Sequence, residues 1–364
     1  MIRKTHMLQA RTFGYRTYRV PGILCTGNDV LIATAEARRG RGGDWDVNDI
    51  VMRRSLNRGF TWEPVTVAVR SSDYGPGPVS NCSMFCDQSG GATHALFCHD
   101  YARIFHMRSD DDGARWSEPR EITGMFEPLR KTYPWRVIAI GPGHGIQLAN
   151  GRLFVPLWMS DGSGTEFGPG RLGHRPSAVA ATYSDDHGQT WQVSDLIVCT
   201  DERYTNPSET VAAQLDDGRV LVNIRNEGTE QRRLVSISPN GESYWSTPEF
   251  IKDLLEPVCM GSLLKLRSGA LLFANPDTLD RTSPPSGPSC GNRKNLTAKL
   301  SHDDGATWPI SRVIEPGPSS YSDLAQTSDG RIHCIYEDGI IERANDTHHI
   351  TVASFDEGWV LSDS

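Results

Sequence analysis

Short apolar stretches of strand length, separated by polar turns, run along the whole chain. Residues 177–183 (SAVAATY) form one such stretch, and a polar turn follows it directly. Stretches in which apolar residues recur with the helical period of 3.6 residues are almost absent. The 35 glycines and 22 prolines are not concentrated in one block, which is typical of a chain with many tight turns. The pattern predicts an all-β protein built from many short strands.

A turn motif of the form Ser-x-Asp-x-Gly-x-x-Trp recurs along the chain. Three copies are intact, one carries Asn at the Asp position, and one carries Asn and Glu at the Asp and Gly positions. The first serines are 54, 75, 54 and 63 residues apart, near the ~50-residue blade of a propeller repeat. The five copies are residues 55–62 (SLNRGFTW), 109–116 (SDDDGARW), 184–191 (SDDHGQTW), 238–245 (SPNGESYW) and 301–308 (SHDDGATW).

The physical role of this motif is a hairpin turn. The Asp or Asn side chain accepts hydrogen bonds from backbone amides, Gly takes a positive φ, and Trp packs between neighbouring sheets. We therefore interpret the motifs as fold markers rather than catalytic groups. About six four-strand units without a composition break predict one domain over residues 1–364, a six-bladed β-propeller with four antiparallel strands per blade. The segments 162–173 and 283–291 are then loops.

Charge and hydropathy narrow the class of partner. The net charge of −8 argues against nucleic acid or an anionic membrane surface as the main partner. No apolar run approaches the roughly 18 residues that a membrane span requires. The charged residues 1–6 are not followed by an apolar signal core, so we expect a cytoplasmic protein or a mature secreted or periplasmic form. The oligomeric state is left open.

The cysteines show neither a CxxC pair nor paired zinc spacing. Buried, reduced thiols in strands are the favoured interpretation. Disulfides, or a metal held by the Cys82-x-x-x-Cys86 pair, are the weaker alternatives. The eight cysteines are Cys25, Cys82, Cys86, Cys98, Cys199, Cys259, Cys290 and Cys334.

The repeated Asp boxes together with the YRVP segment at residues 18–21 resemble the sialidase (neuraminidase) family, the exo-α-sialidases with BNR repeats. The resemblance covers the chain from about Tyr18 to Glu337. It implies a sialidase-like propeller and a retaining exo-glycosidase that releases terminal sialic acid from glycoconjugates. The mechanism implied runs through a tyrosine-linked covalent intermediate and requires no metal or organic cofactor.

A sugar that carries its own carboxylate requires a local cluster of cations in an acidic protein. Arginine suits this role because its planar fork matches a carboxylate and its charge survives burial. The resemblance places the triad on Arg19 in YRVP, Arg225 in VNIRN and Arg293 in RKNLT. Glu337, in YED, matches the carboxylate that orients Arg19.

The nucleophile implied by the resemblance is a tyrosine, which departs from the two carboxylates of most glycosidases. A neutral nucleophile avoids repulsion by the substrate carboxylate, but it needs a base because an unperturbed tyrosine has a pKa near 10. Tyr321, in SYSDL, matches the tyrosine motif. Glu209, in NPSET, matches its base and precedes Arg225 by 16 residues, a short hairpin spacing.

The acid/base is expected on a Gly-rich loop that follows Arg38. Asp44 matches the family's acid, and Trp45 beside it is expected to shield the carboxyl from water. Asp46 and Asp49 are the competing candidates for the same role.

Other pocket residues are assigned less directly. The resemblance places Arg38 in the pocket near C4 of the sugar, with Glu36 supporting it, while Trp135 and Tyr101 are candidate aromatic platforms. Asn81 stands where N-acetylneuraminic acid-specific sialidases often carry an Asp that contacts the N-acyl amide. Sugars without that group, such as the deaminated sialic acid KDN or Kdo, are therefore an alternative substrate class for the same mechanism.

Two readings outside hydrolysis remain open. One is a non-catalytic glycan-binding propeller, which is disfavoured because every catalytic position holds the required residue type. The other is a transferase or intramolecular trans-glycosidase, in which a sugar hydroxyl rather than water attacks the intermediate. In each case the expected partner is a sialylated or related acidic glycan.

Overall fold

The computed structural model describes residues 1–279, 293–342 and 346–362, and the chain divides into two compact units. The first unit comprises residues 1–79 and 253–364, and the second residues 80–252. The predicted all-β class is confirmed: strands dominate, and the described helices are short. Those helices are η1 (Ser71–Asp73), η2 (Thr123–Lys131) and α1 (Glu357–Leu361). In the described part of the chain, no helix has the length and apolarity to cross a bilayer. The expected loop at 283–291, with Cys290, lies outside the described residues.

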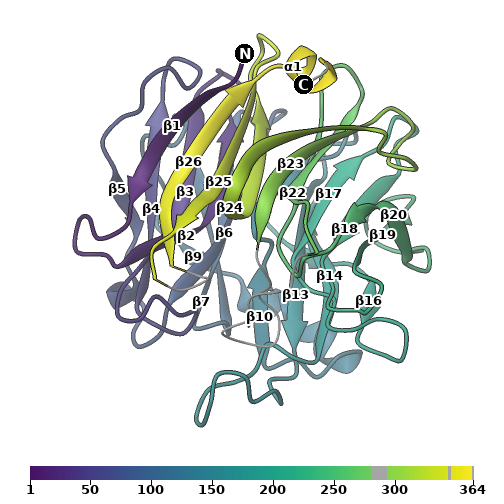
Figure 1. Ribbon diagram of the computed structural model, residues 1–364. Helices are drawn as coiled ribbons and strands as arrows, with labels where there is room; N and C mark the ends of the chain where they lie inside the picture. Colours follow the sequence, from purple (N-terminus) through teal and green to yellow (C-terminus); the bar gives the residue numbers. More distant parts are fainter. Residues whose placement is uncertain (280–292, 343–345, 363–364) are drawn as a thin grey trace. The chain divides into compact units, whose positions relative to one another are not determined.

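The first unit contains a four-stranded and a seven-stranded antiparallel sheet (Figure 1). The four-stranded sheet has the order β2 (Thr17–Cys25), β3 (Leu31–Arg38), β4 (Asn48–Ser55), β5 (Thr66–Val69). The seven-stranded sheet has the order β1 (Arg3–Gln9), β26 (Thr347–Phe355), β25 (Ile332–Ile340), β24 (Ile310–Gln326), β23 (Lys294–Ser301), β22 (Leu271–Pro276), β21 (Ser262–Lys265).

The long strand β24 belongs to both halves of the seven-stranded sheet. Its residues 310–318 pair with β23, whereas residues 319–326 pair with β25. At the far edge, β1 pairs with β26, so a strand from the beginning of the chain completes a sheet built from its last strands. Each half of the sheet thus contains four strands.

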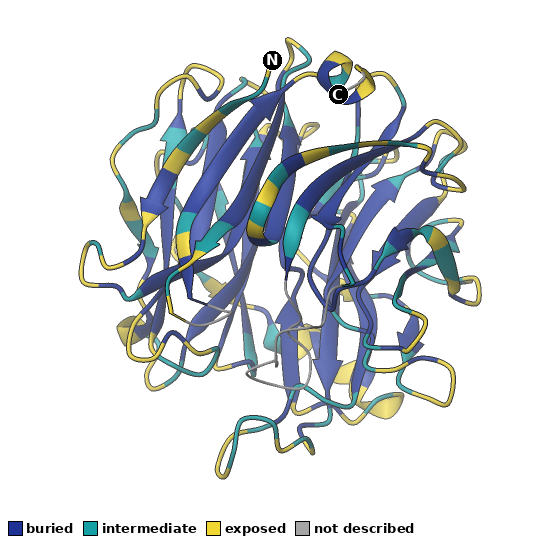
Figure 2. Cartoon of the chain, viewed as in Figure 1, coloured by how far each residue is buried: buried dark blue, intermediate teal, exposed yellow. Residues whose placement is uncertain are grey.

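The core of the first unit lies between these sheets. Leu31 and Val51 of the four-stranded sheet share one buried cluster with Ile335 and Val352 of β25 and β26. A second cluster comprises Leu296 and other buried residues of β22–β26. The helix α1 packs against it. Figure 2 shows that most strand residues are buried, whereas most exposed residues lie in the connecting loops.

The second unit contains three sheets. The first has the order β11 (Gly143–His144), β6 (Val79–Asp87), β7 (Ala92–His99), β8 (Arg103–Ser109), β9 (Arg120–Glu121). The second is built from β10 (Val137–Ile140), β13 (Leu153–Ser160), β14 (Ser177–Ser184) and β15 (Gln192–Val193), with β12 (Ile146–Gln147) on β13 and β16 (Val198–Cys199) on β14. The third has the order β17 (Thr210–Gln214), β18 (Val220–Ile224), β19 (Arg232–Ser238), β20 (Glu249–Leu255).

One pairing departs from the predicted antiparallel pattern. The short strand β11 lies parallel to β6, with Gly143 opposite Ser83. Gly145 follows it and donates its amide to the Met84 carbonyl. A Cβ atom at Gly145 would lie 2.8 Å from a Val155 methyl carbon, so this close approach of the backbone requires glycine.

The five repeated motifs form the turns that their chemistry predicts. In the copy at 301–308, Asp303 Oδ1 accepts from Ser301 Oγ and from the Thr307 amide, at 2.7 and 2.9 Å. The Gly305 amide donates to Ser301 Oγ, and its φ is 85°. In the most degraded copy, Gly241, not the residue at the expected Gly position, takes the positive φ of 72°. The turn there closes one residue earlier, and Asn240 still accepts from backbone amides.

Candidate active site

Glu337 lies at the centre of a buried cluster in the first unit. The carboxylate is 2% exposed and comes from β25, which pairs with β24. In β24 the register shifts between Ser319 and Ser322, so that Ser320 and Tyr321 together oppose Glu337. A second bulge lies in β2, between Arg19 and Gly22. Bulges redirect side chains, so Tyr321 leaves the regular alternation of β24, whereas Arg19 stays in register opposite Glu36 and the bulge follows it.

The bulge in β2 is held by the same carboxylate that binds Arg19. Nε and Nη2 of Arg19 each donate to one Glu337 oxygen, both at 3.1 Å, in a bidentate pair. The Val20 amide donates to Oε1 of Glu337 at 2.9 Å, and Val20 has a φ of 49°, which is strained for a β-branched residue. Pro21 completes the bulge and has no amide hydrogen to satisfy.

The charges of this pair support each other. Burial alone would lower the pKa of Arg19, but the acidic groups around it, Glu337 foremost, together outweigh burial and raise it. Burial alone would raise the pKa of Glu337, but Arg19 and the Val20 amide lower it. Both groups are therefore ionised at neutral pH. Within the described part of the chain, Nη1 of Arg19 has no hydrogen-bond partner.

Tyr321 has two guanidinium groups near its ring. The central carbon of Arg19 is 5.3 Å from the centre of the tyrosine ring, and that of Arg293 is 5.4 Å from it. Arg293 lies directly before β23, donates to Ser320 Oγ at 2.9 Å, and also donates to the Val258 carbonyl. Tyr321 is 8% exposed. The tyrosine ring therefore has two positive charges close to it.

Asp44 is held on the loop after β3 by a buried arginine. Nη1 of Arg38 donates to Asp44 Oδ1 at 2.7 Å and to the Gly42 carbonyl at 3.0 Å. Nε and Nη2 of Arg38 donate to Glu36, at 2.9 and 2.6 Å. Arg38 and Glu36 are almost fully buried, whereas the side chain of Asp44 is 33% exposed. The loop thus presents an accessible carboxylate on a rigid support. Trp45 is half-buried beside it.

The two competing aspartates of this region are committed to local structure. Asp46 Oδ2 accepts from the amides of Arg41 and Gly43, both at 2.9 Å, and so closes the loop turn. Asp49 is 3% exposed in its side chain and accepts from Tyr15, from Arg39 and from both the amide and hydroxyl of Ser71. These contacts leave Asp44 as the carboxylate best suited to meet a substrate.

Glu209 and Arg225 lie together in the second unit, on the hairpin that their spacing predicts. β17 begins directly after Glu209 and β18 ends directly before Arg225, with Thr210 opposite Ile224. The Arg225 amide donates to the Glu209 carbonyl at 3.0 Å, and Nη1 of Arg225 forms an ion pair with Glu209 Oε2. Both side chains are 8–10% exposed.

Three further predicted residues of the second unit are buried. Asn81, in β6, has a φ of 53°, a left-handed conformation that Asn tolerates better than most residues. Tyr101 packs its ring 4.7 Å from that of His174. Trp135 is 1% exposed, and its indole donates to the Phe126 carbonyl at 3.3 Å. The contacts of Tyr101 and Trp135 are packing interactions, and their assignment to the substrate stays a prediction.

Sequence reasoning missed Asp323, which is fully buried in β24. Its Oδ2 accepts from the Ile23 amide of β2 and its Oδ1 from Ser262 Oγ, both at 3.0 Å. Asp323 therefore ties the strand of the tyrosine to the strand of Arg19. The signal was its position two residues after Tyr321, on an apolar strand where a charged side chain needs a partner.

The chain is similar to known proteins over most of its length. A family model described as "BNR repeat-like domain" matches residues 26–334. The sialidase of Micromonospora viridifaciens is 28% identical over 360 residues, which cover 90% of this chain and 50% of that protein. Sialidase-2 of Rattus norvegicus is 27% identical over 360 residues, which cover 88% and 89% of the two chains. The chain spans about half the length of the Micromonospora relative and 60% of a Bacteroides fragilis sialidase.

Solved structures of sialidases resemble this chain in fold. A Hadza microbial sialidase is 26% identical, with a TM-score of 0.76. The matched residues cover 95% of this chain and 67% of that one. The intramolecular trans-sialidase from Ruminococcus gnavus has a TM-score of 0.77 at 15% identity, with 99% of both chains covered. At that identity the likeness concerns the fold alone.

Proposed function

Because the chain belongs to the family of BNR repeat-like domains and matches its sialidases, we propose that it is a glycoside hydrolase of the exo-α-sialidase type. Its substrate is a terminal sialic acid, a 2-keto-3-deoxynonulosonic acid, on a glycoconjugate. The observation that carries the proposal is the buried cluster of Arg19, Glu337, Tyr321 and Arg293. A buried tyrosine with two guanidinium groups near its ring is suited to a substrate that brings its own negative charge.

The arginines supply the recognition of that charge. Glu337 occupies one edge of the Arg19 guanidinium and fixes its plane, so that Nη1 points its donor at the substrate carboxylate without reorganisation. Arg293 supplies a second cation near the same tyrosine ring. We assign Arg225 as the third member of the triad, because its guanidinium is likewise buried and restrained by an acidic partner.

The chemical step assigned to Tyr321 is attack on the anomeric carbon. As the glycosidic bond breaks, Asp44 protonates the leaving oxygen, and the phenolic oxygen bonds to that carbon while its proton passes to a base, the role that the resemblance in sequence assigns to Glu209. In the second step Asp44 removes a proton from water, which attacks the same carbon, and the phenol recovers its proton from Glu209. Two displacements on one centre retain its configuration.

Asp44 requires a change of contact before it acts as an acid. The Arg38 guanidinium, 2.7 Å from Oδ1, favours the ionised form of Asp44. Protonation therefore accompanies movement of the carboxyl group away from Arg38. Gly40 and Gly42, with φ values of 58° and 77°, shape the turn that carries Asp44.

For the fold we propose one six-bladed propeller over residues 1–364. The division of β24 between two sheets supports the count, because it yields six groups of strands. Three groups belong to each compact unit: β2–β5, β21–β24 and β24–β26 with β1 in the first unit, and β6–β9 with β11, β10 with β12–β16, and β17–β20 in the second.

A second candidate substrate keeps the mechanism and changes the sugar. Asn81 lies where an acidic residue is expected for recognition of an N-acyl group, and its side chain is buried. An amide there is compatible with a 2-keto sugar acid that lacks the N-acyl group, namely KDN or Kdo. The cation cluster serves these sugars equally, because they carry the same carboxylate.

The proposal is tested by initial rates with matched fluorogenic glycosides of N-acetylneuraminic acid, KDN and Kdo. We expect turnover of the N-acetyl substrate and loss of at least about 10³-fold in kcat for Tyr321→Phe, which lacks the nucleophilic oxygen. Tyr18→Phe is the matched control, because Tyr18 is a buried tyrosine of the neighbouring strand β2 whose hydroxyl bonds, among the described residues, to Thr12 alone.

Each outcome separates the candidates. Preference for KDN or Kdo, with the same sensitivity to Tyr321→Phe, selects the second candidate. Absence of turnover with all three glycosides, in a folded protein that binds a sialylated glycan, rejects the enzyme in favour of a glycan-binding module. Equal loss of activity in Tyr321→Phe and Tyr18→Phe contradicts the role of the nucleophile.

A further inference from the structure

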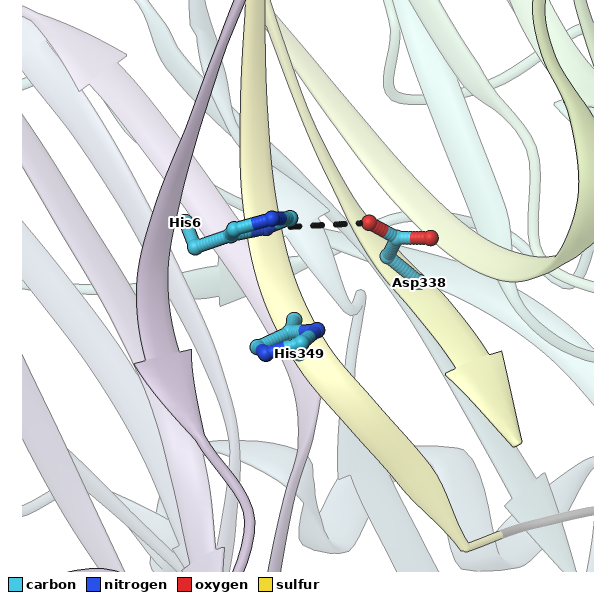
Figure 3. A group of neighbouring side chains, drawn as sticks. All are labelled: His6, Asp338 and His349. Atoms are coloured by element: carbon cyan, nitrogen blue, oxygen red, sulfur yellow. Dashed lines mark ion pairs between the residues drawn. The ribbon is translucent and has the colours of Figure 1, made fainter. Parts of the chain in front are cut away.

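His6, Asp338 and His349 gather on one face of the outer strands of the seven-stranded sheet (Figure 3). They come from the three adjacent strands β1, β25 and β26, with His6 opposite Thr351 and Asp338 opposite His349. One nitrogen or oxygen atom of each lies within 4.8 Å of the other two. Among the residues that the structure describes, this is the single group of three such side chains that close together.

The contacts within the group hold its polar atoms close to one another. Nδ1 of His6 lies 3.8 Å from Oδ2 of Asp338, and its ring stacks on that of His349 with the centres 4.2 Å apart. Thr351 contacts both His6 and Asp338. Its hydroxyl donates to Asp338 Oδ2 at 2.9 Å and lies 2.9 Å from His6 Nδ1. None of these residues has a part in the proposed hydrolysis.

We propose that His6, His349 and Asp338 form a binding site for a divalent first-row transition-metal ion, with zinc as the physiologically plausible occupant. Two imidazole nitrogens and one carboxylate oxygen are a ligand set that zinc takes up, with water in the fourth position.

Binding requires a small local adjustment. Zinc–ligand bonds of about 2.0–2.2 Å bring the ligand atoms to within roughly 3.5 Å of one another. The group must therefore contract by about 1 Å, and the His6 ring must leave its stack on His349. His6 can do so, because its side chain is 60% exposed. Asp338 is 19% exposed and stays in place through Thr351, which orients the carboxylate as an outer-shell partner.

The site joins the first strand of the chain to its last two. A bound ion holds β1 against β25 and β26 across a bulge, since the register of β1 shifts between His6 and Leu8. Strand β25 carries Asp338 on this face and Glu337, the partner of Arg19, on the other. The metal therefore stabilises the strand that orients the substrate-binding arginine, without contact with substrate.

The experiment is calorimetric titration of the chelator-treated, full-length protein with zinc chloride, alongside thermal unfolding with and without zinc. We expect one ion per chain and a midpoint of unfolding that rises with zinc concentration. His6→Ala and His349→Ala, which remove one ligand each, should weaken zinc binding by at least about tenfold. His302→Ala is the matched control, because His302 is an exposed histidine of the same unit outside this group.

Cobalt substitution separates this site from the cysteines. Cobalt bound by nitrogen and oxygen gives d–d absorption without a thiolate charge-transfer band. The proposal is overturned if the wild-type protein takes up no zinc, if His6→Ala and His349→Ala bind as tightly as His302→Ala, or if the thiolate band appears. These outcomes leave the glycosidase proposal untouched, since activity on the fluorogenic glycosides is measured independently.

Discussion

Replacing Glu337 with glutamine removes one charge from the most buried ion pair of the candidate site. Glutamine has nearly the same size as glutamate and keeps one carbonyl oxygen, so the change leaves the packing of β25 intact. Arg19 remains charged, 6% exposed and without its bidentate partner. The Val20 amide, which donates to the same carboxylate at 2.9 Å, keeps at best a neutral acceptor.

The size of the effect follows from burial. Removing one partner of a buried pair leaves an uncompensated charge, which costs about 3–5 kcal/mol. The glutamine oxygen still accepts one hydrogen bond, so we expect a loss near the lower end, about 3 kcal/mol of unfolding free energy at pH 7. Arg19 also loses its fixed plane, and kcat/KM should fall by at least about tenfold.

The pH dependence provides an internal check. Arg19 and the Val20 amide lower the pKa of Glu337 below its usual 4.5, against the effect of burial. A carboxyl group with a lowered pKa in the folded state contributes stability that is fully present above about pH 4.5. This contribution is lost as the pH falls through the folded-state pKa. The difference in stability between wild type and Glu337→Gln should therefore narrow as the pH falls below about 4.5.

The assay is urea unfolding of both proteins at a series of pH values from 7 downward, followed by tryptophan fluorescence. Glu342→Gln is the control, because Glu342 also pairs with arginines but its side chain is 55% exposed. We expect no measurable loss of stability in this control. A loss of less than about 1 kcal/mol for Glu337→Gln at pH 7, or a difference that stays constant with pH, refutes the reasoning.

Two more predictions concern backbone and turn. Gly42→Ala should reduce kcat, because Gly42 has a φ of 77° and the new Cβ would lie 3.0 Å from a Thr17 methyl group, so the Asp44 loop is displaced; unchanged steady-state kinetics would contradict a loop-held acid. Asp303→Ala should lower the unfolding free energy by about 1 kcal/mol, whereas Asp303→Asn should be nearly neutral, because Asn57 performs the same hydrogen bonding in another copy of the turn. Chemical denaturation of the two Asp303 variants decides this, and equal losses would count against the turn.

The turns were predictable from sequence because their hydrogen bonds are local. Asp303 reaches the Thr307 amide four residues away, so spacing alone determines the partner. The same locality placed Glu209 and Arg225 on one hairpin, where their backbones are bonded. The degraded copy shows the limit, since Gly241 closes the turn one position before the motif places its glycine.

The choice among aspartates and the bulges could not be derived in this way. The resemblance to the family favours Asp44 over Asp46 and Asp49, but only the folded loop shows that backbone amides occupy Asp46 and that buried groups occupy Asp49. Likewise, the bulge that sets Tyr321 opposite Glu337 depends on pairing between strands, which no residue pattern along β24 reveals.

The pairing of β1 with β26 has a consequence for the synthesis of the chain. Arg3 pairs with Ser354, about 350 residues later. At roughly 5–20 residues per second, the first strand waits about 18–70 s on the ribosome before its partner emerges. During that time both of its edges are open, and its two apolar residues, Met7 and Leu8, are exposed to other nascent strands. The sheet that orients Arg19 is thus the last to be completed. We therefore expect the yield of native protein to depend on how well residues 3–9 are shielded from other strands until then.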